Sequence, residues 1–467
     1  MSVYAYPDTG HAPPPVDLPG VAHPLLAGPV HPPQRSGRAG PGGQEARGAD
    51  GPNPPHTHTQ SRYTGKSASF AGQGPSAEDA RRRRRHARRQ FLWLASAKKK
   101  VRQCGRVRLE GDTVIRVREG RAHYAGFRSC GDVWACPVCS AKIRNARAAE
   151  ISDAVGRWDQ ANHGVYMVTL TVPHESGMPL GPLWAAMTKA LQAVRSGEVY
   201  QQLKAELGIV ATATAKEVTH GANGWHPHFH LLVFTTKPAS GDGLFDLLTY
   251  FRRSWARQVI KAGLGEPNRL HGVRVDICWS GADAGLYLAK VQDGKSVGNE
   301  VARGDLKPAG DGHRTPFEVV ADLQQFALVA DRDLWAEYEQ VMHGKRAIVW
   351  SRGYRDILGM DLEQTDEEIA AAEVGGQAVA VLSAETWQGV AWRSRVAVPW
   401  SDTKLIGAIA LLEAAERGGL DAVNDLLGAL GVPSARAPAV RVDDDIGEDQ
   451  PDGAGSWQQD AMFGAAS

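Results

Sequence analysis

Hydrophobic and polar residues alternate along several stretches in the middle of this 467-residue chain, with the period of a half-buried β-strand. The stretch GVYMVTLTVPH, residues 164–174, sets Val168, Leu170 and Val172 on one side. Three further strands are predicted: residues 208–220, 224–236 and 272–280. The turn residues GANG between the second and third strands predict an antiparallel hairpin.

Between these strands, apolar residues recur every three or four positions, which predicts amphipathic helices at residues 180–207 and 243–263. A further helix is predicted in GADAGLYLAKVQ, residues 281–292, after the last strand. The order β-α-β-β-α-β is the split βαβ, or ferredoxin-like, arrangement of the α+β class. We therefore expect an antiparallel sheet with helices on one face and the other face free for a ligand.

Composition predicts five parts along the chain: a proline- and glycine-rich disordered tail at 1–85 that ends in an arginine run, a basic segment with a cysteine module at 86–150, the sheet domain at 151–330, a helical C-terminal region at 331–435, and an acidic disordered tail at 436–467. The C-terminal region is expected to end in a helical pair that is broken at Gly418–Gly419.

The net charge of +1 hides a strong segregation of charge. Residues 81–108 carry thirteen lysines or arginines and no acidic residue, whereas residues 443–452 are acidic. This basic block indicates either contact with the phosphates of a nucleic acid or a solvated charge cluster. It begins with five consecutive arginines: Arg81, Arg82, Arg83, Arg84 and Arg85.

No stretch approaches the ~18–20 uncharged apolar residues of a membrane-spanning helix. The N-terminus, MSVYAYPDTG, lacks the basic region and apolar core of a secretory signal. We therefore expect a cytoplasmic protein with no membrane partner.

Four of the five cysteines crowd into one short stretch, with the spacing C-x25-C-x5-C-x2-C: Cys104, Cys130, Cys136 and Cys139. In a reducing cytoplasm such a group indicates metal binding, and the pair CPVC resembles half of a zinc site. The alternatives are buried or free thiols, or His123 in place of one cysteine. A structural Zn²⁺ would order a small domain with little core, and Lys142 and Arg144 could then touch DNA phosphates.

Three histidines fall two residues apart in GWHPHFHLLVF, residues 224–234. Alternate residues of a strand share one face, so His226, His228 and His230 are expected to line one side. The neighbouring strand carries Glu217, which could add a carboxylate. Two imidazoles and a carboxylate leave coordination positions open, as a catalytic metal requires. The alternative is a polar strand edge with hydrogen-bonded imidazoles.

The segment DAGLYLAK places Asp283, Tyr287 and Lys290 on one stripe of a helix. A phenol with a pKa of ~10 is a poor nucleophile unless a metal or a cation favours the phenolate. Lys290 could supply that charge or hold a phosphate oxygen. The alternative is an amphipathic helix with a packed tyrosine and a solvated lysine.

The ordered motifs YMVTLTVPH, WHPHFHLLVF and YLAK resemble those of HUH-family endonucleases. More narrowly, they are similar to single-tyrosine rolling-circle replication initiators of bacterial plasmids, in the actinobacterial, Streptomyces-type style. The resemblance covers about residues 100–355, including GKRAIVWSRG at 344–353, and leaves out both tails.

The resemblance implies a role for each motif residue. His228 and His230 match the paired histidines that hold a catalytic Mn²⁺ or Mg²⁺, and Glu217 matches an acidic third ligand, a role for which His226 competes. Tyr287 matches the nucleophile that becomes linked to the 5′ end of the DNA, with Lys290 as the accompanying lysine. Part of the family has a glutamate four residues before the tyrosine; this chain has Asp283, whose shorter side chain puts its reach in doubt.

A protein of this family nicks single-stranded or hairpin DNA at a plasmid origin and frees a 3′-hydroxyl for a host polymerase, with a host helicase as a further partner. Two other functions share this chemistry, those of a transposase and of a mobilisation relaxase. A zinc-containing DNA-binding regulator without catalysis is the alternative of another class.

Overall fold

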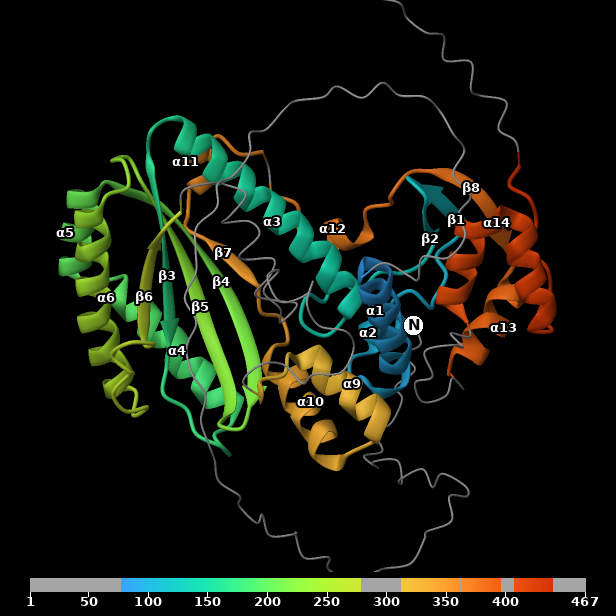
Figure 1. Ribbon diagram of the computed structural model, residues 1–467, viewed down its shortest axis with the longest axis horizontal. Helices are drawn as coiled ribbons and strands as arrows, with labels where there is room; N and C mark the ends of the chain where they lie inside the picture. The colour runs from blue at the N-terminus through green and yellow to red at the C-terminus, as the bar shows by residue number, and fades with distance from the viewer. Residues whose placement is uncertain (1–76, 279–311, 362, 396–406, 440–467) are drawn as a thin grey trace, which may run out of the picture. The chain divides into compact units, whose positions relative to one another are not determined.

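A five-stranded sheet carries the candidate site in the structure, a computed structural model that describes residues 77–278, 312–361, 363–395 and 407–439 (Figure 1). Its strands are β3 (Gly164–Thr171), β4 (Ile209–Gly221), β5 (Gly224–Thr235), β6 (Val273–Ile277) and β7 (Ile348–Trp350). They lie in the order β6-β3-β5-β4-β7, and every neighbouring pair is antiparallel. The four predicted strands are confirmed. The fifth, β7, comes from the region predicted to be helical, so that prediction was wrong there.

Three helices connect the strands in the predicted β-α-β-β-α-β order: α4 (Leu180–Val194), α5 (Glu198–Leu207) and α6 (Gly241–Lys261). The stretch predicted as one helix at 180–207 is two helices, because the chain turns at Arg195–Gly197. These helices pack on one face of the sheet, where Phe229 and Leu231 meet Phe251 and Trp255 in one buried cluster. Burial of such side chains contributes about 1.5–3 kcal/mol each.

The opposite face of the sheet is covered over part of its length. Two helices lie there: α3 (Pro137–Gln160) and α11 (Tyr354–Leu358). Ile151 and Val155 of α3, with Tyr354 of α11, form one buried cluster with Met167 and Leu232 of the sheet. The prediction of a second face that is entirely free was therefore wrong. The covered part lies towards the start of β3, and the histidines lie towards its end.

A second, three-stranded sheet joins two parts of the chain that the sequence separates. Its strands are β1 (Thr113–Arg118), β2 (Arg121–Ala125) and β8 (Gln377–Leu382), in the antiparallel order β2-β1-β8. Helices α13 (Ala384–Arg395) and α14 (Ala408–Ala429) pack on it. The cysteine module and the C-terminal region are thus not separate domains, because β1 needs β8 as its neighbour. The break at Gly418 and Gly419 is confirmed, since both have non-helical backbone angles.

The arginine run is helical and does not belong to a disordered tail, so the predicted boundary at residue 85 was wrong. Helix α1 spans Ala77–Ala95 and is followed by the short helix α2, Lys99–Gln103. Leu92 and Trp93 of α1 are buried in two different apolar clusters, which anchors the helix on both sides. The burial of these two apolar side chains stabilises α1, although the arginine-rich composition of the segment does not indicate it.

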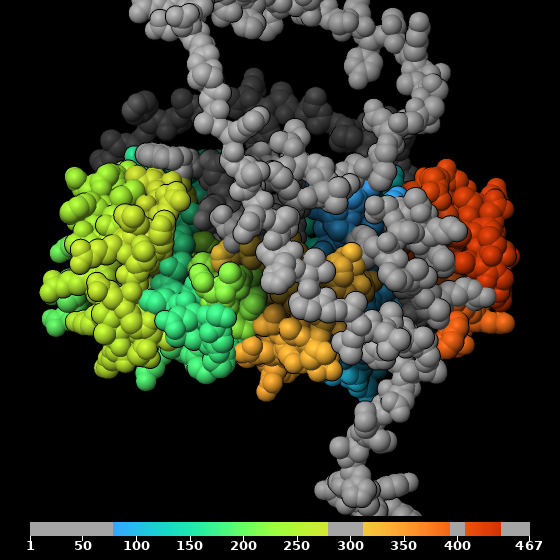
Figure 2. Space-filling model, turned by 60° about the horizontal axis from the view of Figure 1, so that its bottom comes forward, coloured from blue at the N-terminus to red at the C-terminus, as the bar shows by residue number. Residues whose placement is uncertain are grey.

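The remaining described helices are α9 (Pro316–Phe326), α10 (Val329–Val341) and α12 (Asp366–Ala371). Glu337 of α10 accepts hydrogen bonds from the Leu180 backbone N–H and from the Trp225 indole, at 2.6 and 2.8 Å. In Figure 2 the orange surface of α9 and α10 accordingly adjoins green surface of the sheet domain. None of the described helices is long and apolar enough to cross a membrane.

Candidate functional site: a histidine and glutamate group beside a four-cysteine cluster

Three histidines of β5 project from the face of the sheet opposite α4 and α6: His226, His228 and His230. Between them, Phe229 is fully buried in the apolar core of the other face. This is the alternation that the sequence pattern predicts, because successive strand residues point to opposite faces. The strand thus presents its imidazoles on one face of the sheet and its core residues on the other.

Glu217 of β4 lies directly opposite His228 in the register of the two strands. Its carboxylate oxygen Oε2 is 3.1 Å from the Nε2 atom of His228 and 3.5 Å from the Nε2 atom of His230. One carboxylate oxygen of β4 therefore contacts a ring nitrogen of each of two imidazoles of β5. This donor set suits a divalent ion that keeps open coordination positions.

The ring of His230 is held from its other side by Thr169 of β3. The hydroxyl oxygen of Thr169 lies 3.1 Å from the Nδ1 atom of His230, and the histidine is only 3% exposed. A hydrogen bond at one ring nitrogen fixes which way the other nitrogen points. Sequence reasoning missed Thr169, although the alternation of VTLTV already placed it on the histidine side of β3.

His226 belongs to a group of imidazoles next to this convergence. Its ring stacks on that of His174 with centroids 4.4 Å apart, and it lies 4.5 Å from the ring of His228 and 5.5 Å from that of His313. The residue that contacts the Nε2 atoms of both His228 and His230 is Glu217, not His226. His174 ends the TVPH motif and could have been singled out from it, whereas nothing in the local sequence marks His313.

The surroundings set the charge of two of these groups. Burial acts to raise the pKa of the Glu217 carboxyl, but the hydrogen bond and charge of His228, followed by those of His230, lower it to about 2. Burial lowers the pKa of His226 to about 3, and the neighbouring imidazoles act in the same direction. At neutral pH Glu217 is therefore ionised and His226 is neutral.

The predicted nucleophile and its helical neighbours lie outside the described residues: Asp283, Tyr287 and Lys290. Their roles stay predictions.

The described residues on either side of that segment are both tied to the sheet. Before it, the Cys278 backbone N–H donates to the carbonyl of Val165 at 2.9 Å, at the start of β3. After it, Arg314 and His220 exchange backbone hydrogen bonds of 2.6 and 2.8 Å at the end of β4. The chain thus leaves the sheet at one end of the histidine face and rejoins it at the other end.

The four cysteines of the predicted metal site form one buried cluster. Their Sγ atoms all lie within 4.8 Å of one another, and Cys104–Cys139, Cys130–Cys139 and Cys136–Cys104 are separated by 3.5, 3.6 and 3.7 Å. Four thiolates arranged tetrahedrally around Zn²⁺ at bonds of about 2.3 Å would be about 3.8 Å apart. The cluster could therefore hold a metal ion, and its spacing is compatible with structural zinc.

The loop between Cys130 and Cys136 is fixed by its own polar groups. The carboxylate of Asp132 accepts hydrogen bonds from the backbone N–H groups of Trp134 and Ala135, at 3.1 and 2.9 Å, and forms a 3.1 Å ion pair with Lys98. Such a loop holds two thiols in place before α3 begins. The alternative ligand His123 is not in the cluster: it lies on β2, half-buried, and its ring bonds to the carbonyl of Val374.

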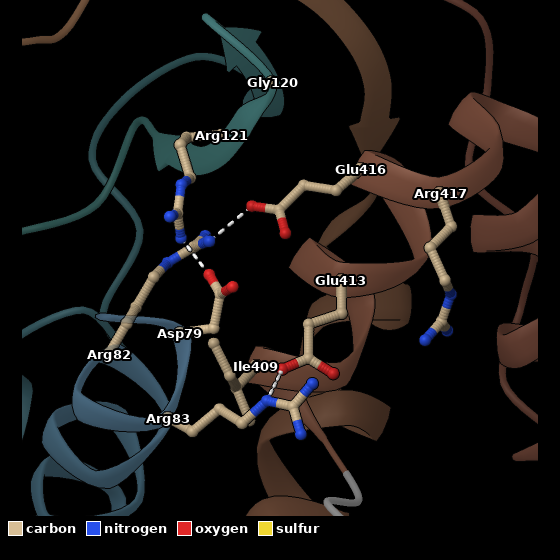
Figure 3. A pocket seen from close by; sticks show the side chains of 9 residues that line it. All are labelled: Asp79, Arg82, Arg83, Gly120, Arg121, Ile409, Glu413, Glu416 and Arg417. Carbon is tan, nitrogen blue, oxygen red and sulfur yellow. Dashed lines mark hydrogen bonds and ion pairs between the residues drawn. The ribbon is translucent and has the colours of Figure 1, made fainter. Parts of the chain in front are cut away.

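The arginine run is engaged within the chain in a way that sequence reasoning missed. Arg82 pairs with Glu416, and Arg83 pairs with Glu413 at 2.5 Å, both on α14 (Figure 3). Arg81 and Arg85 both pair with Glu78. Arg82, Arg83, Glu413 and Glu416 line part of a cavity of about 430 Å³ between α1, the β1–β2 turn and α14. The acidic partners were hidden because two of them lie more than 300 residues away.

The two basic residues predicted to touch DNA beside the cysteines also have partners in the chain. Lys142 donates to the carbonyls of Ala370 and Ala372, which ties α3 to the end of α12. The guanidinium of Arg144 lies over the ring of Trp134, 4.9 Å from its centroid. In this structure both side chains contribute to packing around the cysteine cluster.

Fold and site together define an α+β protein with antiparallel sheets, a convergent pair of histidines with a glutamate, and a four-cysteine cluster that could hold a metal ion. Over 350 residues, 61% of this chain, it is 29% identical to Protein rep of Streptomyces lividans, and the match covers 77% of that protein. It is also 30% identical over 183 residues to Neomycin resistance protein of Streptomyces cyanogenus, which is 32% of this chain and 42% of that protein. No family model and no solved structure matches. The chain is thus similar to a Streptomyces Rep protein, in agreement with the resemblance carried by the three ordered motifs.

Proposed function

We propose that this protein initiates rolling-circle replication of a plasmid by nicking and joining one DNA strand at the plasmid origin. The observation that carries this proposal is the contact of one Glu217 oxygen with the Nε2 atoms of both His228 and His230. The similarity to Protein rep supports the same function.

In this proposal His228, His230 and Glu217 hold one Mn²⁺ or Mg²⁺. The residues fit such an ion, since the same Glu217 oxygen contacts the Nε2 atoms of both histidines and Glu217 is ionised. When bound, the ion would polarise the scissile phosphodiester and stabilise charge on its oxygens. Imidazole ligands favour Mn²⁺, so Mn²⁺ should serve at least as well as Mg²⁺.

Tyr287 is the proposed nucleophile. Its phenolate oxygen attacks the scissile phosphorus, a tyrosine–phosphate bond to the 5′ end forms, and the bond to the 3′-oxygen breaks. The 3′-oxygen takes up a proton from water and leaves as a hydroxyl that a host polymerase can extend. Lys290 favours the phenolate or holds a phosphate oxygen, and Asp283 is proposed as the base that activates water to release the protein after one round.

The second metal site has a different task. We assign Zn²⁺ to Cys104, Cys130, Cys136 and Cys139, which are buried and leave no coordination position for a substrate. Binding a metal there would stabilise the start of α3, the helix that packs on part of the histidine face. The zinc thus supports the site without taking part in the chemistry.

The substrate is the single-stranded or hairpin part of the origin, because the reacting phosphate must reach the sheet surface unpaired. A host helicase and polymerase would act on the nicked product. Among the basic residues, Arg81, Arg84, Lys142 and Arg144 remain candidates for phosphate contacts, and DNA would compete with Glu413 and Glu416 for Arg82 and Arg83.

The test is nicking of a supercoiled plasmid that carries the origin, with Mn²⁺, followed by mass spectrometry of the trapped protein–DNA adduct. We expect wild-type protein to nick and the adduct to map to Tyr287. Tyr287→Phe and His228→Ala should not nick, whereas His271→Ala, an exposed histidine outside the group, should nick normally.

Failure of the wild-type protein to nick, or equal nicking by Tyr287→Phe, would overturn the proposal. Origin binding without any nicking would favour a DNA-binding regulator. Nicking combined with a failure to support replication of an origin-bearing plasmid in cells would favour a transposase or a mobilisation relaxase.

A further inference from the structure

Two exposed arginines stand at the two edges of the histidine face, and neither belongs to the motifs of the proposed reaction. Arg274 lies on the edge strand β6, and Arg346 lies two residues before the other edge strand, β7. Their side chains are 71% and 70% exposed. Ion pairs of side chains that are so exposed contribute little to stability, and a guanidinium at the surface can bind an anion.

The register of the strands places Arg274 on the same face as the histidines. Thr169 of β3 is opposite Arg274 on one side and opposite His230 on the other side. Directly opposed residues of antiparallel strands point to the same face, and the contact of Thr169 with His230 confirms the direction.

The same argument places Arg346 beside Glu217. Ile348 is paired with Ala215, which is paired with His230, and the Lys216 backbone N–H donates to the carbonyl of Ala347 at 2.9 Å. One step further along this register, Arg346 lies next to Glu217. Its partner in the chain is Glu363, at 3.8 Å, a weak exposed pair.

We propose that Arg274 and Arg346 bind backbone phosphates of a single DNA strand that lies across the sheet, over His230 and Glu217, and thereby position it for cleavage. This inference rests on the proposed function. Strands are about 4.8 Å apart, so the two edge strands of this five-stranded sheet lie about 19 Å apart, with the histidine strand in the middle. The two guanidiniums would thus hold the DNA on either side of the reacting phosphate, without base contacts and so without sequence preference.

Each arginine now faces a carboxylate that DNA must displace. Arg274 donates two hydrogen bonds to Asp276, at 2.8 and 3.0 Å, on the same strand. Exposed ion pairs of this kind contribute little to stability, so a phosphate can replace the carboxylate. The carboxylates would hold the arginines in place when no DNA is bound.

The test compares full-length Arg274→Ala, Arg346→Ala and the double variant with wild type. The matched control is Arg118→Ala, since Arg118 is 58% exposed and paired with a neighbouring glutamate, but lies on the other sheet. The probe is fluorescein-labelled oligothymidylate of about 20 nucleotides, bound without added divalent metal and followed by anisotropy between 50 and 200 mM NaCl.

We expect each single variant to bind up to about fivefold more weakly at low salt. The slope of log affinity against log salt should fall by about 0.7 for each arginine, with the control unchanged. Lysine at either position should restore most of the slope. A double variant with wild-type affinity and slope overturns the inference.

A second measurement separates this inference from the proposed function. In nicking assays the arginine variants should raise KM and leave kcat nearly unchanged, because the contact holds substrate and transition state alike. If wild type nicks but the arginine variants match it in both binding and KM, only the inference fails. If wild type binds DNA through these arginines and does not nick, only the proposed function fails.

Discussion

The four-cysteine cluster and the histidine–glutamate group use the same kind of ligand chemistry but differ in how completely the protein encloses them. All four thiols are buried, and their own spacing already matches a tetrahedral ion. In the other group, His228 and Glu217 remain partly exposed and only three donor atoms converge. The comparison separates a site that stabilises the fold from a site that leaves room for a substrate.

The difference follows from the elements that carry each group. The cysteines come from the end of α2, a loop and the first turn of α3, three segments that no shared ladder of backbone hydrogen bonds joins, so an ion would cross-link them. The histidines and Glu217 stand on two long paired strands, which keep their geometry by backbone hydrogen bonds alone. Loss of the metal should therefore unfold the first site and merely inactivate the second.

The largest effect is expected from Cys136→Ser. It removes one ligand of a closed site, so bound zinc should be lost and the free energy of unfolding should fall by at least about 3–5 kcal/mol, given the 10–16 kcal/mol of structural zinc sites. Zinc content by elemental analysis and urea denaturation measure both. The control is Cys278→Ser, whose thiol lies outside the cluster. Full zinc content in Cys136→Ser would show that the cluster is not the zinc site.

A smaller effect on the fold, but a large one on activity, is expected from His230→Ala. Its Nε2 faces the Glu217 carboxylate, so the variant should lose nicking by on the order of 10²–10³-fold, as when one electrostatic catalytic group is removed. Zinc content should stay at the wild-type level. If the variant loses both its zinc and its nicking activity, the two sites are not independent, and this would contradict the comparison.

Thr169→Val tests whether the open site depends on its supporting hydrogen bond. Valine keeps the shape of threonine but removes the hydroxyl that contacts Nδ1 of His230. Losing such a bond typically weakens metal binding about 10- to 100-fold. Titration with Mn²⁺ measures the change, and Thr171→Val is the matched control, since its hydroxyl donates to the His271 carbonyl instead. Equal Mn²⁺ affinity in both variants would contradict the orienting role of Thr169.

Local patterns predicted the main sheet well because its strands and connecting helices follow one another in the chain. The alternation in residues 164–174 and the GANG turn identify β3 and the β4–β5 hairpin directly. Pairing between distant segments could not be predicted in the same way. Strand β8 lies about 260 residues after β1. Its short alternation of apolar and polar residues has no local feature that indicates which strand it pairs with.

The candidate sites show the same division. The cysteine spacing and the H-x-H pattern predicted which residues group together, because each pattern sits on one or two local elements. The ion pairs of Arg82 and Arg83 with α14 were not predictable, because the glutamates become neighbours only after the chain has folded. Charge composition alone could not distinguish such internal pairing from contact with a nucleic acid.

The smallest effect is expected from His226→Gln, which decides whether this histidine is a ligand or only a neighbour of the open site. If Glu217 is the third ligand, the variant should bind Mn²⁺ more tightly than Thr169→Val does and should still nick. The variant should instead differ from wild type in how the free energy of unfolding of the metal-free protein depends on pH. The folded pKa of His226, about 3, lies below its ordinary 6.5, so the unfolded chain takes up the proton first.

His226 therefore contributes stability in full above pH 6.5, and this contribution is lost as the pH falls towards 3. Glu217 loses its own contribution lower, from 4.5 towards 2. The pKa values of His86 and His220 are also lowered, so the contribution of His226 is the difference between wild type and His226→Gln in the interval between pH 6.5 and 4.5. Urea denaturation without added Mn²⁺ or Mg²⁺ should show a decline of stability across that interval in wild type and a flatter curve in His226→Gln. A variant that keeps the full wild-type decline would show that His226 is not the group that titrates there. Loss of Mn²⁺ binding, as in His230→Ala, would make His226 part of the ligand set and the site more closed than the contacts of Glu217 indicate.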